Sequence, residues 1–144
     1  METYAPCPSC HRLNRISLSS GAKAPVCGAC KAEIRMHARV VEVDAIGLQK
    51  LIRQSPLPVV VDFWAPWCGP CLMFAPTYEQ ASKDLEGRFV FAKLDTEAHP
   101  DGAAPYGIRS IPTLMVFQNG AEKKRQSGAA PLASFKAWLA QGFA

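Results

Sequence analysis

All six cysteines of this 144-residue chain lie in three Cys-x-x-Cys pairs, and the pairs differ in character. The first two pairs, Cys7 with Cys10 and Cys27 with Cys30, are separated by 16 residues. At that spacing four thiolates can close a tetrahedral zinc site. The third pair, Cys68 and Cys71, follows a run of apolar residues and precedes a helical pattern. The cysteines therefore predict a metal-binding head, followed by a domain with a redox-active pair.

Length and composition fit one ordinary domain plus a small appendage, with 49% hydrophobic residues to fill a core. No run approaches the roughly 18 consecutive apolar residues that span a bilayer, and the first residues lack the pattern of a signal peptide. We therefore expect a cytoplasmic protein with no membrane partner. Thiols are kept reduced there, so paired cysteines favour metal binding or redox catalysis over permanent disulfides.

The formal net charge of +4 is concentrated in the head, where residues 1–40 carry six Lys or Arg against two acids. Four thiolates around Zn²⁺ would add about two negative charges there. Tyr4 is the only aromatic residue before Phe63, so the head offers few rings on which bases could stack. A nucleic-acid-binding zinc ribbon is therefore a disfavoured interpretation.

Residues 1–39 are polar and hold too few apolar side chains for a core of their own, so we expect them to fold around a metal. Zinc is favoured over two local disulfides, with Gly28 at a tight turn and residues 17–21 as a turn-like stretch. His11 could replace a ligand, but four sulfurs already complete the shell, which predicts a surface position. Whether this head packs on residues 40–144 or moves on its linker is left open.

After the head, hydrophobic periodicity predicts an α/β fold with a mixed sheet and helices on both faces. Asp44 is expected to cap a helix, Pro76 to kink one, and Asn119-Gly120 to close a hairpin. The expected strands are residues 40–43, 59–64, 89–94, 113–118 and 122–127, and the expected helices are residues 44–53, 68–85, 100–106 and 134–143.

From about residue 59 onward the chain carries an ordered set of motifs: Asp62-Phe63-Trp64-Ala65, Trp67-Cys68-Gly69-Pro70-Cys71, Ala75-Pro76, Tyr106-Gly107-Ile108-Arg109, Ile111-Pro112-Thr113, Asn119-Gly120 and Gly128. Through these motifs the chain resembles thioredoxin, and with four preceding cysteines it is similar to the zinc-containing bacterial thioredoxin-2 type. The resemblance implies a thioredoxin fold with a small N-terminal zinc-ribbon-like module.

The third cysteine pair lies at a predicted helix start, where unpaired backbone N–H groups stabilise a thiolate. Cys68 is the natural nucleophile, and Cys71 follows one turn behind to resolve a mixed disulfide. A structural disulfide is a weaker interpretation, because thiols are kept reduced in the expected compartment. A third zinc half-site is weaker too, since no further cysteine pair remains to complete it. Gly and Pro between the cysteines, with no histidine, are typical of reductases rather than oxidants.

Asp62 lies inside an apolar run, so its carboxylate must be solvated at the strand end or buried near a partner. The resemblance implies that Asp62 lies beneath Cys71 as general base and acid, with Lys93 adjusting its pKa. The resemblance also implies a cis peptide bond before Pro112, with the Ile111 backbone pairing with substrate. Trp67, Gly69, Pro70, Gly128 and Ala129 would form the apolar rim, although Gly128 could equally be a turn glycine.

The resemblance implies a general protein disulfide reductase with one Zn²⁺ in the head and no bound organic cofactor. Its partners would be disulfide-containing client proteins and thioredoxin reductase, a flavoprotein that uses NADPH, and the chain would be a monomer. Leu72 departs from the basic residue that many thioredoxins have after the second cysteine. The alternative is a zinc-linked redox sensor or chaperone-like binding protein, whose main activity would survive loss of Cys68. The head itself could be structural, dock partners or release zinc on oxidation.

Overall fold

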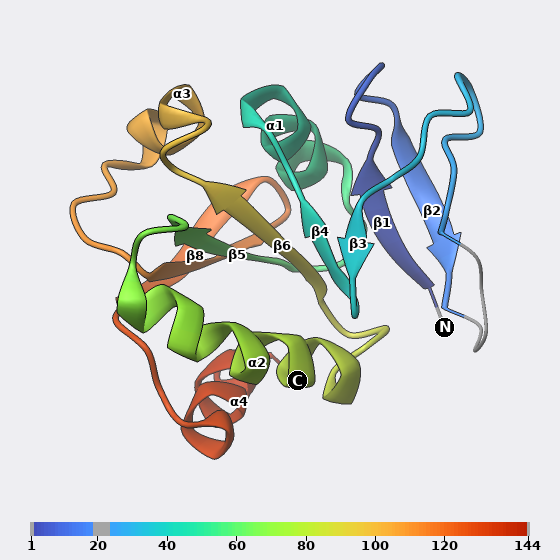
Figure 1. Cartoon of the computed structure of the whole chain (residues 1–144). Coiled ribbons are helices and arrows are strands. Elements are labelled where there is room, and N and C mark those ends of the chain that lie inside the picture. Colours follow the sequence, from blue (N-terminus) through green and yellow to red (C-terminus); the bar gives the residue numbers. More distant parts are fainter. Residues whose placement is uncertain (1, 19–23, 144) are drawn as a thin grey trace.

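The computed structural model describes residues 2–18 and 24–143, so most of the turn-like stretch predicted for residues 17–21 lies outside the described residues. A six-stranded mixed sheet forms the centre, in the order β3-β4-β6-β5-β7-β8 (Figure 1). β4, β6 and β5 run parallel to one another, while β3, β7 and β8 pair antiparallel with their neighbours. The strands are β3 Met36–His37, β4 Val40–Glu42, β5 Val59–Trp64, β6 Val90–Asp95, β7 Thr113–Gln118 and β8 Ala121–Ser127.

Helices cover both faces of this sheet, with α1 and α3 on one side and α2 and α4 on the other (Figure 1). The predicted α/β architecture is therefore confirmed. The helices are α1 Ala45–Gln54, α2 Gly69–Asp84, α3 Pro100–Ala103 and α4 Leu132–Ala140, and a short 3-10 turn, η1 Ala104–Tyr106, follows α3.

Some element bounds differ from those that periodicity predicts. The helix expected at residues 134–143 begins at Leu132 and ends at Ala140, because Gln141 is extended and Gly142 has a φ of 84°. The single helix expected at residues 100–106 is divided into α3 and η1. The edge strand β3, absent from the sequence prediction, pairs with β4 by only two residues.

Alternation along β5 sends successive side chains to opposite faces of the sheet. Val59, Val61 and Phe63 enter the core cluster beneath α1, whereas Val60 enters the cluster beneath α2 and α4. By the same period of two, Asp62 faces the α2 side, to which the cysteine-bearing helix belongs. The strand pattern alone thus places this carboxyl group on the correct face.

The four-cysteine head is built on a two-stranded antiparallel sheet, β1 Glu2–Pro6 and β2 Leu13–Ser17, which packs beside α1 (Figure 1). Ala5 and Ile34 are fully or almost fully buried and belong to the main core cluster. A Cβ on Gly47 of α1 would lie 3.1 Å from Pro6, so the head approaches the helix closely. The head therefore shares the core of the main domain, which compensates for its own shortage of apolar residues.

A hydrogen-bonded contact ties the head to the start of α1. Asp44 caps this helix through Oδ1, which accepts the Gly47 N–H at 2.7 Å, while Oδ2 lies 2.9 Å from His11 Nε2. The His11 side chain is 23% exposed, so it lies partly buried at the surface rather than freely solvated. Burial tends to raise the pKa of Asp44, but the Gly47 N–H and His11 outweigh it and lower that pKa.

Asp44→Ala is expected to lower the free energy of unfolding by about 1–2 kcal/mol, because it removes both the helix cap and the contact with His11. Asp44→Asn keeps a good cap and should lose less than half of that amount. Since the pKa of Asp44 is lowered on folding, its contribution is complete above about pH 4 and is lost as the pH falls further. Urea unfolding at pH 7 and pH 3 measures both effects. Equal destabilisation by Ala and Asn would contradict the capping role.

Candidate functional site

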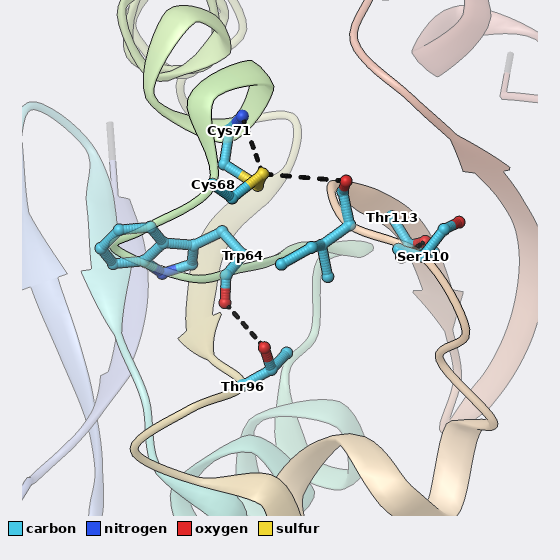
Figure 2. The surroundings of a disulfide bond; sticks show 7 residues. Trp64, Cys68, Cys71, Thr96, Ser110 and Thr113 are labelled. Atoms are coloured by element: carbon cyan, nitrogen blue, oxygen red, sulfur yellow. Dashed lines mark hydrogen bonds between the residues drawn. A yellow bond between two sulfur atoms is a disulfide. The ribbon is translucent and has the colours of Figure 1, made fainter.

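The redox pair lies where β5 passes into α2. Cys68 is the N-cap of α2, and its Sγ accepts the backbone N–H of Cys71 at 3.2 Å. The two sulfurs form a disulfide with a Cα–Cα distance of 5.2 Å (Figure 2). Cys68 is 5% exposed and Cys71 only 2%, so an incoming molecule would reach Cys68 first. The arrangement suits a thiolate at a helix N-terminus, with the second sulfur buried behind it.

A loop from the end of η1 to β7 lies against the disulfide. The carbonyl oxygen of Ile111 is 3.8 Å from Cys68 Sγ (Figure 2), and the peptide bond between Ile111 and Pro112 is cis. Gly128 donates its N–H to the Pro112 carbonyl at 2.8 Å with a φ of 90°, a conformation that favours glycine. The structure thus brings Ile111, Pro112 and Gly128 together beside Cys68, as the resemblance implied.

Exposed groups surround the disulfide. The Trp67 side chain is 68% exposed, and Gly69, Pro70 and Ala129 are exposed as well. A large apolar side chain held in water next to a reactive bond is available to a docking partner. The residues predicted to bind substrate therefore lie at the surface around Cys68.

Asp62 lies on the buried side of the pair and is 4% exposed. Together with Cys71 it lines a partly open cavity of about 120 Å³. Among the described residues its Oδ1 has no hydrogen-bond partner. Burial raises the pKa of Asp62 to about 7, although the charge of Lys93 partly opposes the shift. Of the two positions open from sequence, the buried one is therefore correct.

Lys93 stands opposite Asp62 in the parallel register of β5 and β6. Its ammonium group lies 3.7 Å from a Glu42 carboxylate oxygen and 4.7 Å from the centre of the Trp64 ring. The Lys93 ammonium group therefore interacts with Glu42 and Trp64 and not with Asp62 alone. Lys93 therefore weakens the shift in the pKa of Asp62 without abolishing it.

Tyr78 is a further polar residue of this cavity that sequence reasoning did not identify. Its hydroxyl lies 2.7 Å from the Ala92 carbonyl oxygen and 3.1 Å from that of Val60, so it joins β5 and β6. Burial, together with the nearby charge of Asp62, raises the pKa of Tyr78 far above its usual value. Its apolar helical spacing predicts a core position but gives no sign of the hydroxyl contact.

The four head cysteines meet as their spacing predicts. All four sulfurs lie within 4.8 Å of one another, with 3.5 Å between Cys7 and Cys30 and 3.6 Å between Cys10 and Cys27. A tetrahedral zinc with Zn–S bonds of about 2.3 Å has sulfur–sulfur edges of about 3.8 Å. Each cysteine is free of a disulfide in the part of the chain that the structure describes. The donor set is therefore compatible with a zinc ribbon, and the structure lacks the two local disulfides.

Backbone N–H groups favour the thiolate form of Cys7 and Cys27, the first cysteine of each pair. Those of Cys30 and Ala29 lower the pKa of Cys27 to about 6, and the pKa of Cys7 is lowered chiefly by the N–H of Cys10. At Cys30 the Ala32 N–H acts in the same direction, but the other head cysteines and burial outweigh it and raise the pKa to about 11. Metal binding requires deprotonated thiols, so a lowered pKa favours it at neutral pH.

Each Cys-x-x-Cys pair of the head forms a tight turn, called a knuckle below, and Gly28 lies in the second of these turns, as predicted. Gly28 is not among the described residues with positive φ. His11 and Lys31, each directly after the second cysteine of its pair, have φ values of 65° and 68° and donate their N–H groups back to the carbonyl oxygens of Cys7 and Cys27. The Gly28 N–H donates to Asn14 Oδ1 at 3.0 Å, which joins the second knuckle to β2.

Comparison with known proteins shows which family has this arrangement. The thioredoxin family model matches residues 39–141. Thioredoxin C-3 of Corynebacterium nephridii is 39% identical over 135 residues, which cover 94% of this chain and 92% of that protein. The chain belongs to the thioredoxin family. As a thioredoxin-family protein with a joined Cys68–Cys71 pair, it is a thiol–disulfide oxidoreductase.

Two further thioredoxins are similar over the main domain. The thioredoxin of Synechocystis sp. is 47% identical over 90 residues, covering 62% of this chain and 84% of that protein. Thioredoxin M4, a chloroplastic protein of Arabidopsis thaliana, is 43% identical over 106 residues, covering 72% of this chain and 54% of that protein. The longer match to thioredoxin C-3 also includes part of the four-cysteine head. No helix among the described residues has the length and apolar character to cross a membrane.

Proposed function

We propose that this thioredoxin is a cytoplasmic, monomeric protein disulfide reductase that NADPH-dependent thioredoxin reductase recharges. The observation that carries the proposal is the Cys68–Cys71 pair at the N-terminus of α2, with Cys71 and a buried Asp62 lining one cavity. The reducing compartment is proposed because four further cysteines remain free of disulfides in the described structure.

In the first step the Cys68 thiolate attacks one sulfur of a client disulfide. A bond forms between Cys68 Sγ and that sulfur, and the other client sulfur leaves as a thiolate. The helix N-terminus stabilises the attacking anion, since Cys68 Sγ accepts the N–H of Cys71. The Ile111 backbone and the exposed Trp67 would hold an extended client segment against the pair, by strand addition and apolar contact.

In the second step Cys71 attacks Cys68 Sγ and releases the client as a second thiolate. Cys71 must first lose its proton, and Asp62 is the group placed to take it across the shared cavity. A pKa of Asp62 near 7 lets the carboxyl group both accept and return a proton at neutral pH. The client gains two electrons, and Cys68 and Cys71 become the disulfide. Thioredoxin reductase would then reverse this oxidation with electrons from NADPH.

In the head, Cys7, Cys10, Cys27 and Cys30 would hold one Zn²⁺. The ion would act as a structural cross-link between the two knuckles, and the reductase steps above do not involve it. The packing of Ala5 and Ile34 into the main core supports a structural role, because the head then covers part of that core.

Insulin-disulfide reduction coupled to NADPH oxidation tests the proposal. With thioredoxin reductase present, NADPH should be oxidised at a rate proportional to the concentration of this protein. Omission of the protein, insulin or the reductase should stop the reaction. Turnover driven by dithiothreitol but not by the reductase would reject the proposed recharging partner. Absence of turnover with both reductants would reject the disulfide reductase and favour the zinc-linked sensor or binding protein.

A further inference from the structure

Leu72 combines two properties. Its side chain is 52% exposed, and it also lines the partly open pocket that contains Asp62 and Cys71. Leu72 therefore lies at the opening through which water reaches this pocket. The next residue, Met73, is 82% exposed and is not part of the cavity lining.

The other charged and titratable groups around the cavity come from two elements. Lys93 faces it from β6, and Tyr78 and Glu79 face it from α2. Lys93 is paired with Glu42 of β4, and Glu79 lies 3.3 Å from His37 of β3. Lys93 and Glu79 are thus each paired with a group other than Asp62. Asp62 Oδ1 has no hydrogen-bond partner among the described residues. The environment of Asp62 therefore depends on how far water has access to the pocket.

On the basis of the function proposed above, we propose that Leu72 is a positioning residue that limits the access of bulk water to the Asp62 pocket and so sets the pH range in which Asp62 serves Cys71. Leu72 touches neither the client nor the reacting sulfurs in this role. It acts through Asp62, by covering part of the opening of the pocket and keeping the carboxyl group poorly hydrated.

The direction of the effect follows from desolvation. The pKa of Asp62 is about 7 because burial disfavours its charged form. Leu72→Ala would widen the opening and admit more water, which stabilises the carboxylate and lowers that pKa. Leu72→Lys would in addition place a cation at the opening of the pocket, which shifts the pKa in the same direction.

Met73 provides matched controls, since Met73→Ala and Met73→Lys make the same chemical changes one residue away on the exposed surface. The titration of the Asp62 carboxyl carbon is followed by carbon-13 NMR in the oxidised protein, which does not require activity. The pH profile of insulin reduction is measured in parallel, with Asp62→Asn to identify the limb that belongs to Asp62.

We expect both Leu72 variants to shift the Asp62 titration and its limb of the pH profile downward by about one pH unit. The Met73 variants should shift them by less than about a third of that. Equal shifts in the Leu72 and Met73 variants would overturn the proposal, because a general surface field would then explain them. An unchanged Asp62 titration in both Leu72 variants would also overturn it, even if reduction of insulin proceeds normally. Loss of insulin reduction in the native protein would instead reject the proposed function, while the NMR titration still tests the role of Leu72 at the pocket.

Discussion

Cys68→Ser is expected to lower kcat/KM for insulin reduction by at least about 10³-fold, because a serine hydroxyl stays protonated at neutral pH and cannot replace an attacking thiolate. The fold should be unaffected, since Ser and Cys differ little in volume. A serine oxygen at this position can still accept the Cys71 N–H. The coupled NADPH assay measures the loss, and circular dichroism checks the fold.

The roles of Cys68 and Cys71 are distinguished by whether a mixed disulfide with the client accumulates in each serine variant. Cys71→Ser should retain the first attack but not the second, so the mixed disulfide between Cys68 and a client should persist and appear in non-reducing mass spectrometry. Cys68→Ser should form no such adduct through this pair. Because Cys10 and Cys30 are exposed, reduction that persists in Cys68→Ser would locate the chemistry in the head and contradict the assigned nucleophile.

Loss of the zinc site is the second large effect. Cys27→Ser should reduce bound zinc from one ion per chain to nearly none and should unfold the head locally. Structural zinc binding in small modules contributes on the order of 10 kcal/mol to folding, and the packing of Ala5 and Ile34 into the main core offsets its loss only in part. Metal analysis measures the zinc, and amide hydrogen exchange over β1 and β2 measures the local unfolding.

Ser9→Ala is the matched control for this variant. Ser9 lies in the first knuckle and is exposed, and it contributes to the sulfur cluster only through its backbone N–H, which donates to Cys7 Sγ at 3.3 Å. Zinc content and exchange should therefore stay at native values. Native protein that binds no zinc, or full zinc occupancy in Cys27→Ser, would contradict the proposed ligand set.

Much of this arrangement could be read from local patterns. Apolar runs and helical periods predict most strands and helices, because burial on one or two faces imposes a period on the chain itself. Alternation along residues 59–64 places Asp62 on the same face as Val60 and therefore toward α2. The position of Cys68 at a helix N-terminus follows from the helical pattern that begins after it.

Contacts between distant segments could not be predicted from local sequence patterns. The contact between His11 and Asp44 could not be predicted, because the two residues are 33 positions apart and are joined only by docking of the head. Gly28 lies in the predicted turn, but the left-handed backbone conformation falls on His11 and Lys31, after the second cysteine of each pair. The hydroxyl of Tyr78 meets two strand carbonyls that no spacing on its own helix could reveal.

The sequence by itself determined the fold class and the two kinds of cysteine pair, because each depends on residue type and short spacing, whereas the candidate residues around Cys68 were implied by the resemblance to thioredoxin. Only the tertiary structure decided that the head packs on α1, that Asp62 is buried beside Cys71 with a pKa near 7, and that Leu72 lies at the opening of their pocket. The physical reason is that burial and cavity shape depend on side chains contributed by several elements. Their effects on desolvation and charge arise only when those elements are packed together.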